Sequence, residues 1–90
     1  NWNQTSRDVF NFVRAICSPG PMARAYINGQ EMKINKVEFI RNAPSYKCVI
    51  GAILNKNHDG FLVKTQDSFV KVTEFEYDGT IKVGDRFDVK

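Results

Sequence analysis

Residues 10–23 have the sequence Phe-Asn-Phe-Val-Arg-Ala-Ile-Cys-Ser-Pro-Gly-Pro-Met-Ala, and this stretch decides more about the fold than any other. Apolar residues recur at helical spacing up to Cys17, which predicts the end of an amphipathic helix. The Pro-Gly-Pro step at 19–21 ends that helix, because proline has no amide donor and clashes with the preceding turn. The chain is therefore expected to turn sharply and to continue as extended structure.

The predicted helix begins at a hydroxyl cap on Thr5. Asp8 follows three residues later, where the positive end of the helix dipole favours a carboxylate. The apolar stripe that faces the core consists of Val9, Phe10, Val13, Ile16 and Cys17. The residues predicted on or beside the opposite face are Arg7, Asn11 and Arg14.

A β-hairpin is predicted directly after the helix. Residues 23–27 alternate apolar and polar side chains, and Asn28-Gly29 indicates a tight turn into residues 30–39. The apolar parity of the second strand slips at Asn35-Lys36. Such a slip predicts a β-bulge, which bends a strand at the corner of a small barrel.

Three further strands are predicted in the second half of the chain. Residues 46–54 form a buried strand with a bend at Gly51, residues 55–60 form a turn, and residues 61–65 and 68–75 form a hairpin. Five to six short strands, a register slip and internal glycines favour a mainly β fold. We expect a small, split β-barrel of the oligonucleotide-binding (OB-like) type with one N-terminal helix.

Length and composition predict a single domain over residues 1–90. The hydrophobic fraction of 42% is enough for a core, and no apolar run is long enough to span a bilayer. Cys17 and Cys48 are expected to be buried, reduced thiols, which favours a cytoplasmic location. No membrane is expected as a partner, because the chain has no apolar run of membrane-spanning length. The chain starts at Asn1, and Trp2 has no evident partner in the predicted core. Residues 1–90 are therefore interpreted as a domain excised from a longer protein.

No catalytic, cofactor-binding or metal-binding residue is predicted in this chain. His58, the one histidine, lies in a polar turn and is expected to face solvent. One histidine and two distant cysteines do not supply a zinc site. The glycines lie at turns and strand bends, and do not form a phosphate-binding loop before a helix. We interpret the chain by itself as noncatalytic.

The net charge of +3 comes from 13 Lys and Arg against 10 Asp and Glu. This excess is small for a nucleic-acid-binding protein, so the placement of the charges matters more than their sum. Most of the basic residues lie in the first half of the chain, at Arg7, Arg14, Arg24, Lys33, Lys36 and Arg41. They are either dispersed solubilising charges or one surface for an anionic ligand, which Lys64 and Lys71 would extend.

Several stretches of the chain resemble the C-terminal domain of the formyltransferase family that includes methionyl-tRNA formyltransferase. In the first half they are Asn1-Trp2, Ser6, Phe12-Val13-Arg14-Ala15, Pro19-Gly20-Pro21 with Ala23, Asn28-Gly29 and Lys33-Ile34. In the second half they are Gly51-Ala52-Ile53 and residues 59–65, Asp-Gly-Phe-Leu-Val-Lys-Thr. The resemblance covers nearly the whole chain.

This resemblance implies an OB-like domain that follows a catalytic domain. That upstream domain transfers a formyl group from 10-formyltetrahydrofolate to an amine, and the catalytic residues of the family lie there. In the enzymes that act on transfer RNA, the C-terminal domain provides a basic surface for the RNA. Relatives that formylate amino sugars on nucleotide carriers have similar tail domains.

Three hypotheses for the function follow. In the first, the domain binds transfer RNA through phosphate contacts from Arg14, Arg24, Lys33 and Lys36. In the second, it is a structural or dimerisation tail of a sugar-nucleotide N-formyltransferase, which associates through apolar surface that includes Trp2 and Tyr26. In the third, it is an independent single-strand-binding barrel, with Tyr26 and Tyr46 as the stacking residues.

Overall fold

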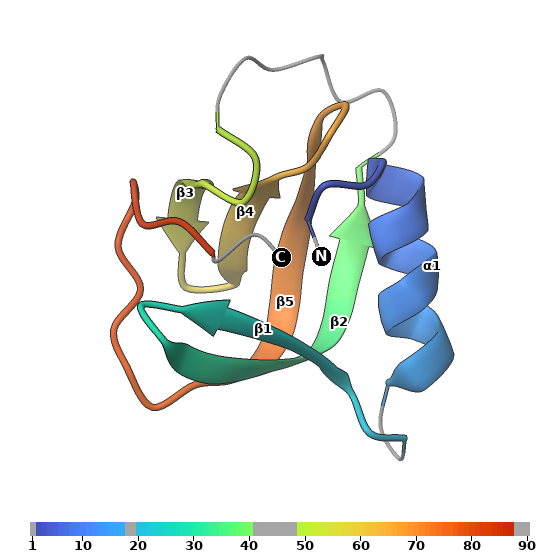
Figure 1. Ribbon diagram of the computed structural model, residues 1–90, viewed down its shortest axis with the longest axis horizontal. Coiled ribbons are helices and arrows are strands. Elements are labelled where there is room, and N and C mark those ends of the chain that lie inside the picture. Colours follow the sequence, from blue (N-terminus) through green and yellow to red (C-terminus); the bar gives the residue numbers. More distant parts are fainter. Residues whose placement is uncertain (1, 18–19, 41–48, 88–90) are drawn as a thin grey trace.

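The computed structural model describes residues 2–17, 20–40 and 49–87. Within these ranges it contains one helix and five strands in an antiparallel sheet of order β1-β2-β5-β4-β3. The elements are α1 (Ser6–Ile16), β1 (Ala23–Ile27), β2 (Gln30–Phe39), β3 (Ile53–Asn57), β4 (Gly60–Lys64) and β5 (Phe69–Glu76). The helix packs mainly against β2, on the opposite side of the molecule from β3 (Figure 1).

The sheet curves into a split barrel. Its edge strands β1 and β3 both meet the segment near the C-terminus, because Phe87 bridges to Ile27 of β1 and Arg86 bridges to Ala52, just before β3. The amide of Phe87 also donates to the carbonyl oxygen of Gly51 at 2.9 Å. The prediction of a mainly β, OB-like split barrel with one N-terminal helix is confirmed.

The β1–β2 hairpin has the predicted turn and bulge. Asn28 and Gly29 have φ angles of 53° and 78°, and the type of turn that matches strand twist requires positive values at both positions. The pairing of β2 with β5 shifts register on both sides of Lys36. The change of parity in the sequence therefore did locate the bulge.

Both ends of α1 follow the predicted signals. Thr5 is the N-cap, and its hydroxyl accepts from the amide of Asp8 at 3.2 Å. After Ile16 the chain becomes extended at Cys17, and the amide of Met22 returns to the carbonyl oxygen of Ile16 at 2.7 Å. The helix therefore ends before the Pro-Gly-Pro step, and β1 starts directly after the turn.

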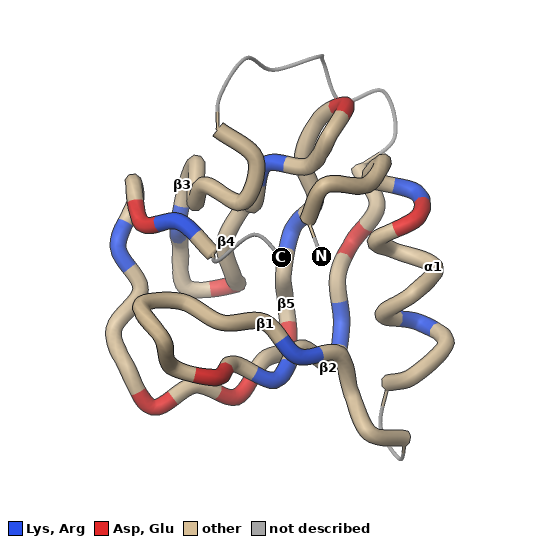
Figure 2. The backbone as a smooth tube through the Cα atoms, viewed as in Figure 1, with Lys and Arg blue, Asp and Glu red and all other residues tan. Residues whose placement is uncertain are grey.

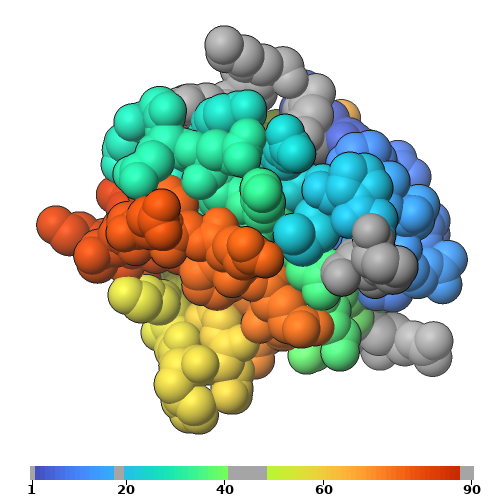
Figure 3. All heavy atoms as spheres, turned by 90° about the horizontal axis from the view of Figure 1, so that it is seen from below, coloured from blue at the N-terminus to red at the C-terminus, as the bar shows by residue number. Residues whose placement is uncertain are grey.

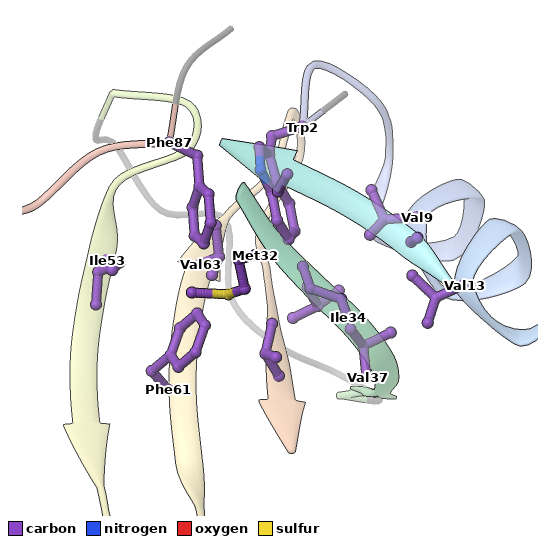
Figure 4. Packing of buried hydrophobic residues seen from close by; sticks show 14 of the residues in the cluster. Trp2, Val9, Val13, Met32, Ile34, Val37, Ile53, Phe61, Val63 and Phe87 are labelled. Carbon is purple, nitrogen blue, oxygen red and sulfur yellow. The ribbon is translucent and has the colours of Figure 1, made fainter. Parts of the chain in front are cut away.

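The hydrophobic core joins α1, the sheet and both ends of the described chain. Trp2 is only 5% exposed, and its ring centroid lies 5.0 Å from that of Phe87 (Figure 4). The prediction that Trp2 has no partner in this domain is wrong, because two residues from opposite ends of the sequence meet at one end of the core. The remaining buried apolar side chains include Val9, Val13, Ala25, Ile27, Met32, Ile34, Val37, Ile53, Phe61, Val63, Val70, Val72 and Ile81.

The third strand differs most from its prediction. β3 starts at Ile53 and continues to Asn57, so residues 55–57 belong to a strand and not to a turn. They pair with the start of β4 across a tight turn at His58-Asp59, and this pairing outweighs the polar character of the sequence. Val49 is exposed, whereas residues 46–48 lie outside the described part of the chain. The β4–β5 hairpin forms as predicted.

Candidate nucleic-acid interface

Arg24 and Lys33 are direct partners in the register of β1 and β2. Both side chains point to the outer face, because the neighbouring Ala25 and Met32 enter the core. Arg24 is exposed and Lys33 is half-buried. Two of the four predicted phosphate-binding residues therefore lie side by side on the hairpin.

Carboxylates surround this pair. Nη1 of Arg24 lies 3.8 Å from Oε2 of Glu31, and Lys33 is opposite Glu76 of β5. A shallow recess of about 200 Å³ joins Lys33 to Glu31, Glu76, Tyr77 and Asp78. Figure 2 shows basic and acidic positions interleaved where β1, β2 and β5 meet. Acidic side chains therefore lie beside both cations on this face.

Arg14 and Lys36 share a groove between α1 and β2, which we call the α1–β2 groove. It encloses about 290 Å³, and Arg14 comes from the helix whereas Lys36 comes from the bulge of β2. Figure 3 shows the face of the molecule on which the helix, the segment leading into β1, β2 and β5 come together. The lining of the groove consists of Phe10, Val13, Arg14, Cys17, Asn35, Lys36, Val37 and Glu74.

Aromatic rings hold the arginines of α1 along this side of the barrel. The guanidinium carbon of Arg14 lies 5.4 Å from the centroid of Phe10, and that of Arg7 lies 4.7 Å from the centroid of Phe39. The two rings are 6.1 Å apart. Such stacking favours a flat guanidinium that keeps its outer N–H groups available to an anion. Arg7, Phe39, Phe10 and Arg14 therefore form one continuous row.

The proposed extension of the basic surface to Lys64 is wrong. Lys64 is only 4% exposed, and its ammonium donates to the carbonyl oxygens of Thr65 and Gln66. The reason is that its backbone pairs with Gly51 and Ala52, which cover the end of β4. Lys71 is half-buried on β5 opposite Glu38, and Arg41 lies outside the described residues.

Hydrogen bonds attach the N-terminus of α1 to the β4–β5 turn. We call the residues that form them, Ser6, Thr65 and Asp67, the Ser6 cluster. The sequence patterns did not reveal this cluster. The Ser6 and Thr65 hydroxyl oxygens are 2.7 Å apart, and both residues are buried. Oδ1 of Asp67 accepts from the Ser6 amide at 2.9 Å and from the Ser6 hydroxyl at 3.1 Å. Ser6 belongs to the family resemblance, which was the one signal available.

The carboxyl group of Asp67 is held in its ionised form. Burial acts to raise its pKa, but hydrogen bonds from the amide and hydroxyl of Ser6 and the hydroxyl of Thr65 outweigh burial and lower the pKa below the ordinary value of 3.8. The carboxylate also lies at the first turn of α1, where the helix dipole favours negative charge. Asp67 therefore acts as a second cap of the helix from the distant β4–β5 turn.

Among the described residues, no three His, Cys, Asp or Glu side chains gather closely enough to hold a metal ion. His58 is exposed in the β3–β4 turn, with Nε2 3.3 Å from Oδ1 of Asp59. Cys17 is a half-buried free thiol in the α1–β2 groove. As far as the chain is described, it has no helix that is both long and apolar enough to cross a membrane.

Comparison with known proteins decides the family. Residues 1–84 match the family described as formyl transferase, C-terminal domain. The chain belongs to this family. It is 33% identical to the methionyl-tRNA formyltransferase of Mycoplasma capricolum subsp. capricolum, over 98% of this chain and 32% of the relative.

Two further relatives have the same name. The methionyl-tRNA formyltransferase of Mycoplasma mycoides subsp. mycoides is 34% identical over 98% of this chain and 32% of its own length. That of Acetivibrio thermocellus is 32% identical over 89% of this chain and 25% of its own length. The chain thus spans about a third or less of these curated relatives. The resemblance stated from the sequence is confirmed.

Proposed function

We propose that this formyltransferase C-terminal domain is a noncatalytic substrate-binding domain that contacts transfer RNA through phosphate groups. The observation that carries the proposal is the arrangement of four cations in two pairs, Arg24 with Lys33 on the hairpin and Arg14 with Lys36 on the α1–β2 groove. The names of the relatives support transfer RNA as the ligand. In this proposal, an upstream catalytic domain carries out formyl transfer from 10-formyltetrahydrofolate.

The four residues are expected to contribute unequally. Arg14 is exposed, and within the described residues no carboxylate lies within ion-pair distance of it. Lys36 is also exposed, with Glu74 opposite it in the ladder. Arg24 is engaged with Glu31, and Lys33 is half-buried among carboxylates. We therefore rank Arg14 and Lys36 first, Arg24 next and Lys33 last.

The dimerisation-tail alternative has less support. Trp2, one of its two apolar contact residues, is buried in the core of this domain. The other, Tyr26, is 47% exposed and its hydroxyl donates to Glu31 at 3.3 Å. A competition assay on the intact protein, with transfer RNA and a nucleotide-linked amino sugar as rival acceptors, separates the two proposals. We expect transfer RNA alone to act as acceptor.

The direct test is the salt dependence of transfer RNA binding by the intact protein. Each phosphate contact contributes about 0.7–0.9 to the slope of log affinity against log salt, so four contacts give a slope near 3. Arg14→Gln should lower that slope by about one. The control is Lys82→Gln, because Lys82 is exposed in the segment after β5, which runs along the side away from α1 (Figure 1). Binding that is absent or independent of salt would refute the proposal.

A further inference from the structure

We propose that the α1–β2 groove binds one unpaired nucleotide, with its base on the apolar floor and its flanking phosphates on Arg14 and Lys36. This inference rests on the proposed function and narrows it. It assigns the groove to a single-stranded part of the RNA, whereas phosphate contacts alone do not distinguish single strands from duplexes.

The floor of the groove has the chemistry that a base requires. Val13 and Val37 are buried beneath it, and Phe10 is partly buried at its side. Its 290 Å³ lies at the lower limit of the roughly 300–1,000 Å³ typical of small-molecule pockets. The space therefore suits one planar heterocycle and not a longer ligand.

The rim of the groove has the charges that the neighbouring phosphates require. Arg14 rises from the helical wall and Lys36 from the strand wall, so the two cations lie on either side of the floor. The Arg14 guanidinium stacks on the ring of Phe10, which also lines the groove. Glu74 lies opposite Lys36 and also lines the groove, where its carboxylate can accept from the N–H groups of a base edge.

Two other recesses in the described part of the domain lack this combination. The recess at Lys33 has three carboxylates, Glu31, Glu76 and Asp78, which repel a phosphate. The space between α1 and β1, beside Arg24, is only about 30 Å³ and cannot admit a base. Aromatic or apolar contact with the base together with cations for the backbone is the usual pattern of single-strand binding.

Alkylation of Cys17 reports occupancy of the groove, because this half-buried thiol is part of the lining. The intact protein is treated with a thiol reagent, and mass spectrometry of the peptide that contains Cys17 gives the rate. The rate is measured alone, with a short single-stranded RNA, and with a duplex of the same number of phosphates. We expect the single strand to slow alkylation at least tenfold and the duplex to leave the rate within twofold.

A variant that fills the groove provides the second measurement. Cys17→Phe adds bulk inside the groove without changing any charge, and Ala15→Phe adds the same ring at an exposed position of α1 outside the groove lining. We expect Cys17→Phe to weaken single-strand binding about tenfold, the order of one lost base contact, with an unchanged salt slope. Ala15→Phe should bind like the parent.

Four results would overturn the inference, and together they separate it from the proposed function. Equal protection of Cys17 by single strand and duplex, or equal affinity of the two phenylalanine variants, would exclude a nucleotide in the groove. Salt-dependent transfer RNA binding without any protection of Cys17 would leave the phosphate-contact proposal standing and refute this one. Absence of binding to every RNA would refute both.

Discussion

The two ends of α1 differ in burial and in the contacts that they make. At the N-terminal end, Ser6 is buried and bonded to Thr65 and Asp67 of a distant turn. At the C-terminal end, Arg14 is exposed and borders an open groove. Buried hydrogen-bonded groups contribute to stability, whereas exposed charges contribute little to it. The helix is therefore fixed at its N-terminal end, and it presents Arg14 at its C-terminal end.

The largest effect is expected from a change that breaks the sheet at the start of β4, the end of this strand away from the Ser6 cluster. Gly60 opens β4 with a φ of 151°, and a Cβ there would collide with the carbonyl oxygen of Val72. Gly60→Ala should lower the free energy of unfolding by about 4 kcal/mol or more, because backbone cannot move aside cheaply. Urea denaturation measures this loss.

Gly29→Ala is the matched control for Gly60→Ala. Gly29 also has a positive φ, 78°, but nothing lies within 4 Å of an added Cβ. Gly29→Ala should lower the free energy of unfolding by about 1–2 kcal/mol, the strain of a left-handed residue alone. Equal losses in the two variants would mean that the collision at Val72 is relieved by movement of the strand.

The next largest effect is expected in the Ser6 cluster. Thr65→Val removes a buried hydroxyl that contacts Ser6 and accepts from the Ser68 amide, while the shape of the side chain is kept. It should lower the free energy of unfolding by about 1–3 kcal/mol, the cost of unsatisfied buried polar groups. Urea denaturation again provides the measurement. A change below 0.5 kcal/mol, the range of ordinary surface substitutions, would show that the cluster does not hold the helix.

A smaller, pH-dependent effect is expected at Asp67. Its pKa is lower in the folded state than the ordinary 3.8, so its ionised form contributes stability above that pH. This contribution is lost as the pH falls from 3.8 through the lowered pKa of the folded state. Asp67→Asn should therefore be less stable than the parent at neutral pH, and the two should converge in strong acid. Urea midpoints at several pH values test this, and a constant difference would contradict it.

The smallest effect on stability is expected at the open end of the helix. Arg14 is exposed, and its described contact is with the Phe10 ring. Arg14→Gln should change the free energy of unfolding by no more than about 0.5 kcal/mol. Thermal or urea denaturation measures this. A loss as large as that of Thr65→Val would show that Arg14 is structural.

The parts of the fold that are set by residues close together in the sequence were predictable. The alternation in β1, the Asn28-Gly29 turn and the bulge at Lys36 are all local patterns, and each of them is confirmed. The contact of Trp2 with Phe87 joins opposite ends of the described chain, and no periodicity indicates such a pair.

The basic residues of the candidate site were predictable from the sequence, but the acidic residues opposite them were not. Sequence placed Arg14 and Lys36 on neighbouring elements, and the structure brings them to one groove. It did not reveal that Glu74 and Glu76 stand opposite Lys36 and Lys33, because the pairing of β2 with β5 joins segments far apart in the chain. Lys64 was misplaced for a similar reason, since residues 51–52 cover its strand end.

The most direct test compares transfer RNA affinity in two variants of the intact protein, Arg14→Gln with Lys36→Gln at the open end and Thr65→Val at the fixed end. We expect the double charge variant to lose affinity for transfer RNA and to have a salt slope lower by about two phosphate contacts, while its stability is unchanged. Thr65→Val should lose stability and keep the parent's salt slope. Unchanged transfer RNA binding by the double charge variant would show that Arg14 and Lys36 do not contact the RNA.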